Sequence, residues 1–216
     1  LIFDEAVDLH KKFFDTYISQ DLPFQPQWCE LDWPKHPALD YMRRCFDFDP
    51  QFSEAEIRGM IAAYLGACTR LDEQIGRVLD RLESLGLSDR TRVVYTSDHG
   101  EHQGSRGIFG KFTMYDESAA VPLILAGPDI PAGHVVNTPV SLVDCFPTVL
   151  EAVGAAPVAE DNDLPGRSLW PFAQGLEADR TVFSEYHAVG AQNANYMLRS
   201  PEYKYIYYFN DPPQLF

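Results

Sequence analysis

The sequence lacks closely spaced cysteines. Its four cysteines, Cys29, Cys45, Cys68 and Cys145, are scattered and form no Cys-x-x-Cys pair of the kind that binds zinc or exchanges disulfides. Because Cys68 falls on an apolar helical face and Cys145 in another predicted helix, we expect buried, reduced thiols. Reduced thiols favour the cytoplasm as the compartment.

Basic clusters and long apolar runs are also missing. The net charge is −15 and no basic cluster offsets it, which argues against nucleic acid or an anionic membrane as a partner. No apolar run approaches the roughly 18 residues of a membrane span. The chain starts at Leu1 instead of methionine and stops at Phe216 directly after an aromatic run, so we expect a piece of a longer sequence. The absence of a targeting segment is then uninformative.

The composition is that of a globular protein. With 216 residues, 45% hydrophobic and 23% charged, the chain can form one large domain or most of one. Residues 1–50 mix short apolar pieces with prolines, which predicts an extended, loop-rich segment. The prolines are Pro23, Pro26, Pro34, Pro37 and Pro50.

A long helix is the clearest predicted element. Ser53-Glu54-Ala55-Glu56 has the pattern of a capping box, and Gly86 supplies a stop. Between them apolar residues recur at spacings of three and four, from Ile57 to Leu85. A helix of this length is able to run along one whole face of a sheet.

The remaining pattern alternates strands and helices before an antiparallel end. Buried strands are predicted at 92–96 and 121–126, a helix from Ser141 to about Val153, a strand at 181–185, and a hairpin pairing 196–199 with 204–208. This order predicts an α/β fold with a mixed sheet. We assign 1–50 to the loop-rich segment, 51–155 to the α/β core portion, and 156–216 to a small C-terminal subdomain.

The residues that follow the first strand are suited to chemistry. Asp98 and His99 end that strand at the edge where α/β sheets hold ligands, and Lys111 comes from the next loop. A carboxylate and an imidazole suit a divalent cation, and a lysine suits an oxyanion. Each also has a plain alternative, because a strand can end in a structural Asp-x-Gly turn and a lysine can extend along an apolar surface.

Two neighbours of this pair are harder to interpret. The surrounding glycines disfavour a helix, so His102 is not expected to form a metal pair with His99 and is read as a supporting or surface residue. Glu101 would matter only if it points inward.

The ordered motifs resemble the second half of the sulfatase family, within the alkaline-phosphatase superfamily. The resemblance covers roughly residues 50–216, and the Asp-His-Gly form is similar to choline sulfatases and phosphonate monoester hydrolases. The motifs are Ser97-Asp98-His99-Gly100-Glu101, Gly110-Lys111, Met114–Ser118 running into Val121–Ile124, Gly127-Pro128, Ser141–Asp144, Pro147–Leu150, Leu164–Leu169 and Tyr203–Ile206.

The resemblance implies a fold and a site. The fold would be an alkaline-phosphatase-like mixed sheet flanked by helices, present as a partial domain with a small C-terminal antiparallel subdomain. Asp98 and His99 would bind one divalent cation, Ca²⁺ in most of the family, with Mn²⁺ or Mg²⁺ as alternatives. Lys111 would bind the oxygens of a small anionic ester and assist the leaving group. Glu185 and His187 would line the substrate pocket, although a surface strand end explains them equally well.

Several parts of the family pattern are missing: the nucleophile motif, the early metal-binding Asp-Asp or Asp-Asn strand and the substrate histidine of a His-x-Pro sequence. The family nucleophile is a formylglycine made in a Cys-x-Pro-x-Arg motif. Cys145-Phe146-Pro147-Thr148-Val149 has the proline but lacks the arginine, and the other three cysteines fit no better. We therefore expect a fragment that does not turn over substrate by itself.

Three functions stay open on the sequence. The first is metal-dependent hydrolysis of sulfate esters, and the second is hydrolysis of phosphodiesters or phosphonate monoesters on the same scaffold. The third is a non-catalytic acidic module for binding or subunit contact. Self-association into a homo-oligomer is compatible with all three.

Overall fold

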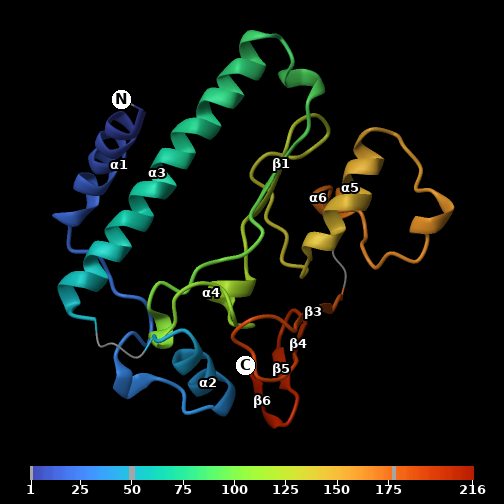
Figure 1. Cartoon of the computed structure of the whole chain (residues 1–216). Helices are drawn as coiled ribbons and strands as arrows, with labels where there is room; N and C mark the ends of the chain where they lie inside the picture. Colours follow the sequence, from blue (N-terminus) through green and yellow to red (C-terminus); the bar gives the residue numbers. More distant parts are fainter. Residues whose placement is uncertain (1, 49–51, 177–178) are drawn as a thin grey trace.

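The computed structural model describes residues 2–48, 52–176 and 179–216 (Figure 1). The helices are α1 (Ile2–Ile18), α2 (Pro37–Cys45), α3 (Glu54–Ser84), α4 (Asp116–Ala119), α5 (Cys145–Ala152) and α6 (Trp170–Ala173). The strands are β1 (Val93–Thr96), β2 (Leu123–Ala126), β3 (Val182–Tyr186), β4 (Asn195–Arg199), β5 (Lys204–Tyr208) and β6 (Asp211–Leu215). No helix of the described residues combines the length and apolarity needed to cross a bilayer.

The first segment is more helical than its prolines suggest. The prediction of an extended, loop-rich 1–50 is wrong over α1 and α2. α1 ends at Ile18, before Pro23, the first proline, so its backbone hydrogen bonds are intact. Pro37 begins α2, at a position where the missing proline N–H costs nothing. Pro50 lies outside the described residues.

The long helix begins as predicted. The Ser53 N–H donates to Glu56 Oε2 at 2.7 Å, and the Glu56 N–H donates to Ser53 Oγ at 3.3 Å, which completes the capping box. The first turns of α3 bury Ile57 and Ile61 beside Leu22. α3 also packs along α1 (Figure 1).

The later part of α3 is not buried against a sheet, although its length would allow this. Apolar positions of the same stripe stay open, with Leu71 48% and Val78 61% exposed. Cys68 is exposed as well, so the expectation of a buried thiol there is wrong. The apolar stripe is continuous in sequence, but it is buried only near Ile57 and Ile61. The described residues therefore cover the apolar side chains at the beginning of α3 and not along its whole length.

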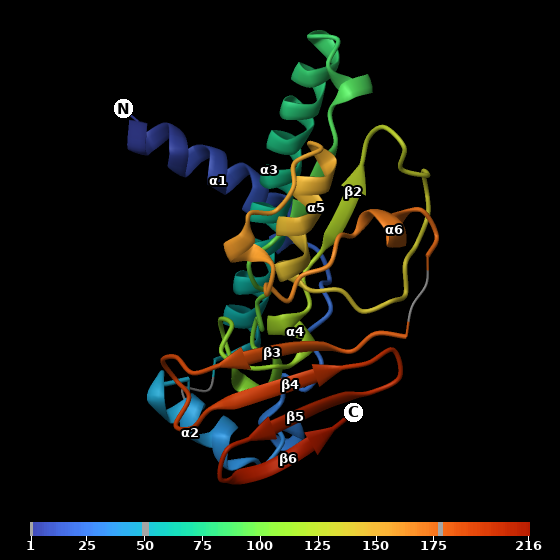
Figure 2. The ribbon, with the colours of Figure 1, turned by 90° about the vertical axis from the view of Figure 1, so that its right-hand side faces the viewer.

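Both described sheets are antiparallel. β1 pairs with β2 in the register Val93↔Ala126 to Thr96↔Leu123. The four C-terminal strands form a meander in the order β3-β4-β5-β6, which is plain in Figure 2. This confirms the predicted hairpin, because β4 and β5 pair from Asn195↔Tyr208 to Arg199↔Lys204.

The C-terminal sheet is joined to the β1–β2 connection by a shared apolar cluster. Met197, Ile206 and Tyr208 pack with Met114, which lies ahead of β2 in the chain. Beside this cluster the buried Lys204 ammonium contacts Asp116 Oδ1 at 2.5 Å. The sheet therefore supports the segment that leads into α4.

A buried ion pair closes the region around α5. Asp144 is fully buried and accepts from the two terminal nitrogens of the Arg180 guanidinium, at 2.7 and 2.8 Å. The N–H groups of Ser141 and Arg167 also donate to it, each at 2.8 Å. Burial raises the pKa of Asp144, but Arg180 and the two backbone donors outweigh it, so the pKa lies below its ordinary value.

Removing the arginine tests this arrangement. We expect Arg180→Ala to lower the free energy of unfolding by about 3–5 kcal/mol, because it leaves a buried carboxylate without its cation. Lys11→Ala, which breaks an exposed pair with Asp15, is the control and should cost within about 0.5 kcal/mol. Urea unfolding measures both. A loss in Arg180→Ala no larger than in the control would contradict the assignment.

Candidate active site

The connection between β1 and β2, residues 97–122, is called the site loop here. Three backbone hydrogen bonds draw it together, one inside the next. The Gly104 N–H donates to the Ile108 carbonyl at 3.0 Å, the His102 N–H to the Gly110 carbonyl at 3.0 Å, and the Gly100 N–H to the Ser118 carbonyl at 2.8 Å. The long connection therefore behaves as an extension of the β1–β2 pair.

Gly100 allows the tightest of these contacts. A Cβ at this position would lie 2.1 Å from the Glu117 carbonyl oxygen, so no other residue fits without moving the backbone. The contact holds the end of β1 against the segment before β2. Asp98 and His99 lie directly before it.

The partners of His99 determine its tautomer. Nδ1 lies 2.9 Å from the Gly100 carbonyl oxygen, which only accepts, so Nδ1 carries the proton. Nε2 contacts the Lys111 ammonium, which only donates, so Nε2 presents its lone pair. Histidines that bind metals have the same arrangement: one ring nitrogen faces the metal and the other donates to a carbonyl or carboxylate.

Asp98 faces the same nitrogen. Its Oδ2 lies 3.4 Å from His99 Nε2, and its Oδ1 accepts from the His99 N–H at 3.1 Å. Partial desolvation raises the pKa of Asp98, but His99, backbone N–H groups and Lys111 together bring it below its ordinary value. The carboxylate is therefore charged at neutral pH, and its side chain is 84% exposed.

These two groups fit part of a metal site. A carboxylate oxygen and an imidazole lone pair directed to one place are common ligands of divalent cations. Within the described residues no third His, Cys, Asp or Glu joins them, so they make an incomplete ligand set.

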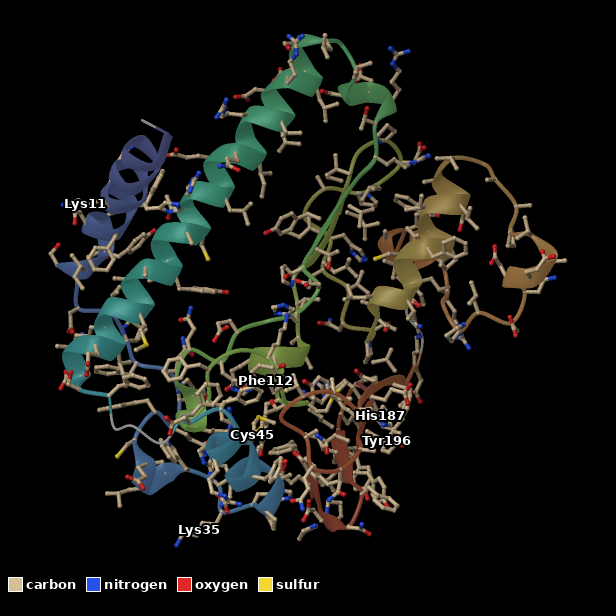
Figure 3. The ribbon with its side chains drawn as sticks, in the orientation of Figure 1. Lys11, Lys35, Cys45, Phe112, His187 and Tyr196 are labelled. Atoms are coloured by element: carbon tan, nitrogen blue, oxygen red, sulfur yellow. The ribbon has the colours of Figure 1, made fainter. Side chains whose placement is uncertain are left out.

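Lys111 is presented from an anchored backbone. Before it, Gly110 has φ +79°, a left-handed conformation that favours glycine. After it, the Phe112 ring stacks on Phe46 with centroids 4.1 Å apart, and Figure 3 labels Phe112 near α4. The lysine side chain itself is exposed and directs its ammonium to His99.

The structure brings Asp98, His99 and Lys111 together but leaves Glu185 and His187 apart from them. Glu185 Oε2 and His187 Nε2 lie 3.3 Å from each other, and both side chains are half exposed. The His187 ring meets Tyr196 edge-on at 5.2 Å, on the C-terminal sheet (Figure 3). Among the described residues, no hydrogen bond or ion pair connects either residue to the other three.

His102 is fully buried, so its interpretation as a surface residue is wrong. Its Nε2 lies 2.8 Å from Thr113 Oγ1, across the site loop. Burial lowers its pKa from 6.5 to about 4, which keeps the ring neutral. The glycines around His102 give no sign of this burial, which depends on Thr113 across the loop.

An ion pair inside the loop was missed altogether. Arg106 donates to Glu117 Oε1 at 2.6 Å and to Ser105 Oγ at 2.8 Å, and its guanidinium lies over Tyr115. Burial raises the pKa of Glu117, but hydrogen bonds from Arg106, a backbone N–H and Ser105 outweigh burial. The pKa of Glu117 therefore lies below its ordinary value. In the sequence, Arg106 stands in the short stretch Gly104-Ser105-Arg106-Gly107, which gives no indication of a partner eleven residues later.

Comparison with known proteins identifies the family. Residues 10–155, more than half of the chain, match the sulfatase family. The chain belongs to the sulfatase family. Residues 100–215 of this sulfatase chain also match the C-terminal region described as N-sulphoglucosamine sulphohydrolase, C-terminal.

Among curated proteins, the sulfatase chain is similar to Arylsulfatase K. The Danio rerio protein is 37% identical over 200 residues, which are 88% of this chain and 38% of that protein. The Homo sapiens protein is 34% identical over 211 residues, or 92% of this chain and 39% of that protein. The chain thus spans about two fifths of the length of these relatives.

Solved structures support the fold class. A phosphonate monoester hydrolase from Silicibacter pomeroyi has a TM-score of 0.76 and 31% identity, covering 91% of this chain and 44% of its own. A structure in complex with its substrate D-glucosamine-2-N,6-O-disulfate has a TM-score of 0.65 and 28% identity, with 79% and 37% covered. The α/β, alkaline-phosphatase-like fold predicted for a partial sulfatase domain is confirmed.

The buried histidine of this sulfatase chain makes stability depend on pH. In the unfolded chain His102 binds a proton below pH 6.5, whereas in the folded chain it does so only near pH 4. Stability is therefore lost as the pH falls from 6.5 towards 4. From pH 7 to pH 5 we expect His102 to account for a loss of about 2 kcal/mol.

The measurement is the free energy of urea unfolding at both pH values, for the unmodified protein and for His102→Gln. The loss between pH 7 and pH 5 should be smaller in His102→Gln, whatever the starting stability of that variant. Equal pH dependence in both proteins would show that the pKa of His102 is the same in the folded and the unfolded chain.

Proposed function

We propose that the protein carrying this chain hydrolyses sulfate esters of small molecules with the help of one divalent cation. The observation that carries the proposal is the convergence of Asp98, His99 and Lys111 at the end of β1, in a chain of the sulfatase family. The curated relatives that support this activity are longer than the chain, so the activity is proposed for the intact protein.

Lys111 has the role of binding the ester oxyanion. Its ammonium is exposed and, among the described residues, forms no ion pair with a carboxylate within the usual distance. A positive group held where negative charge develops stabilises the transition state and assists departure of the leaving group.

Asp98 and His99 have the role of holding the cation, with Ca²⁺ as the first choice and Mn²⁺ or Mg²⁺ as alternatives. When bound, such a cation would neutralise charge on the ester oxygens. Asp98 is charged at neutral pH, and the Gly100 carbonyl keeps the His99 lone pair on Nε2. The Asp98 carboxylate is thus in the charged form that ligation requires.

The nucleophile is proposed to come from outside these 216 residues. No cysteine of the chain lies in a Cys-x-Pro-x-Arg sequence, so we expect no turnover by the chain alone. Glu185 and His187 are proposed to contact the organic part of the substrate, since both are open to solvent beside Tyr196.

A second function has one specific observation in its favour. The phosphonate monoester hydrolase from Silicibacter pomeroyi is 31% identical to this chain, so phosphonate monoesters or phosphodiesters are the alternative substrates. The two functions are separated by the ratio of kcat/KM for p-nitrophenyl sulfate to that for p-nitrophenyl phenylphosphonate. A ratio above one favours the sulfatase, and a ratio below one favours the phosphonate hydrolase.

The lysine can be tested directly. We expect Lys111→Ala in the intact protein to lower kcat/KM for p-nitrophenyl sulfate about 100-fold, because one oxyanion donor is lost. Lys35→Ala, which removes an exposed lysine ahead of α2 (Figure 3), is the control and should leave the rate unchanged. Unchanged rates in both variants would place the active site elsewhere in the protein.

The cation requires a separate experiment. Treatment with a chelator should abolish hydrolysis, and addition of Ca²⁺, Mn²⁺ or Mg²⁺ should restore it and identify the ion. We expect Asp98→Asn to need a concentration of that ion at least about tenfold higher for half-maximal rate, because an amide oxygen replaces a charged ligand. If Asp98→Asn responded to the ion as the unmodified protein does, Asp98 would not be a ligand.

A further inference from the structure

We propose that Glu101 is a positioning residue for Lys111, an inference that rests on the proposed function of that lysine. Glu101 itself has no hydrogen bond or ion pair with Lys111 or His99 among the described residues. Its action is on the residue immediately before the lysine.

The Glu101 carboxylate holds Gly110 by its backbone. Oε1 accepts from the Gly110 N–H at 2.6 Å and from the Gln103 N–H at 3.1 Å. The first bond crosses the site loop and the second is local. One oxygen of Glu101 therefore connects the first half of the site loop with the second half. A charged acceptor makes such bonds shorter and stronger than a neutral one.

The next residue holds the other side of the same glycine. The His102 N–H donates to the Gly110 carbonyl at 3.0 Å. Both backbone polar groups of Gly110 are thus fixed by consecutive residues. A glycine without these bonds has wide conformational freedom because it lacks a Cβ, and the two bonds hold Gly110 at φ +79°.

This conformation decides where Lys111 points. On the far side of the lysine, Phe112 is fixed by stacking on Phe46. With Gly110 fixed as well, the backbone of Lys111 is held at both ends, and its ammonium is directed at His99 Nε2. Without Glu101, the Gly110 N–H has no acceptor, and the backbone position from which the Lys111 side chain extends is no longer fixed.

The charge and the reach of Glu101 can be separated by substitution. Glu101→Gln keeps an oxygen that reaches Gly110 but removes the charge, whereas Glu101→Asp keeps the charge but shortens the reach by one methylene. Positioning requires reach, so the glutamine should retain function and the aspartate should lose it. A role for the charge alone predicts the reverse.

The probe is inorganic sulfate, titrated calorimetrically into the intact protein, with Lys111→Ala establishing that binding depends on the lysine. We expect Glu101→Ala and Glu101→Asp to raise the Kd for sulfate about tenfold, and Glu101→Gln to stay within about threefold. Glu56→Ala is the matched control, because it removes another short bond from a backbone N–H to a carboxylate, at 2.7 Å in the cap of α3. It should lower stability without changing the Kd for sulfate.

The outcomes are distinct. Sulfate binding that is lost in Lys111→Ala but unchanged in both Glu101→Ala and Glu101→Asp overturns the positioning role and leaves the proposed function standing. Sulfate binding that survives Lys111→Ala overturns the proposed function and the inference with it. If Glu101→Ala does not fold, as judged by near-ultraviolet circular dichroism, the glutamine and aspartate variants decide alone.

Discussion

The contact between Gly100 and the Glu117-Ser118 backbone is the constraint on which the site depends. It is closer than any side chain permits, since a Cβ would lie 2.1 Å from the Glu117 carbonyl oxygen. Glu117 is in turn held by Arg106, from the tip of the same loop. The end of β1, the tip of the loop and the approach to β2 are therefore tied at one point, and Asp98, His99 and Lys111 take their places from it.

The charged residues around the site loop differ in their partners. Other cations around the loop are engaged by carboxylates: Arg106 by Glu117 and Lys204 by Asp116. The Lys111 ammonium instead contacts the His99 imidazole, and among the described residues it forms no ion pair with a carboxylate. In a chain of net charge −15, this contrast sets Lys111 apart from Arg106 and Lys204.

Sequence patterns predicted those parts that depend on local rules. The capping box at Ser53, the strands at both sides of the site loop and the hairpin from β4 to β5 follow from periodicity and turn chemistry, and the structure has them. The closeness of Asp98, His99 and Lys111 also followed, because a strand end and a short return of the chain limit their separation. Contacts between distant residues did not follow. The burial of His102 depends on Thr113 and the helix α1 on packing with α3, and neither partner is marked by spacing.

The nested hydrogen bonds of the site loop have a consequence for how the chain folds. Pairing Thr96 with Leu123 in one step would have to close all of residues 97–122, and the entropy cost of closing a loop rises with its length. With Gly104–Ile108 formed first, then His102–Gly110 and then Gly100–Ser118, each closure is short. The loop can form from its tip to its base, so Gly110 would be bonded to His102 before β1 and β2 meet.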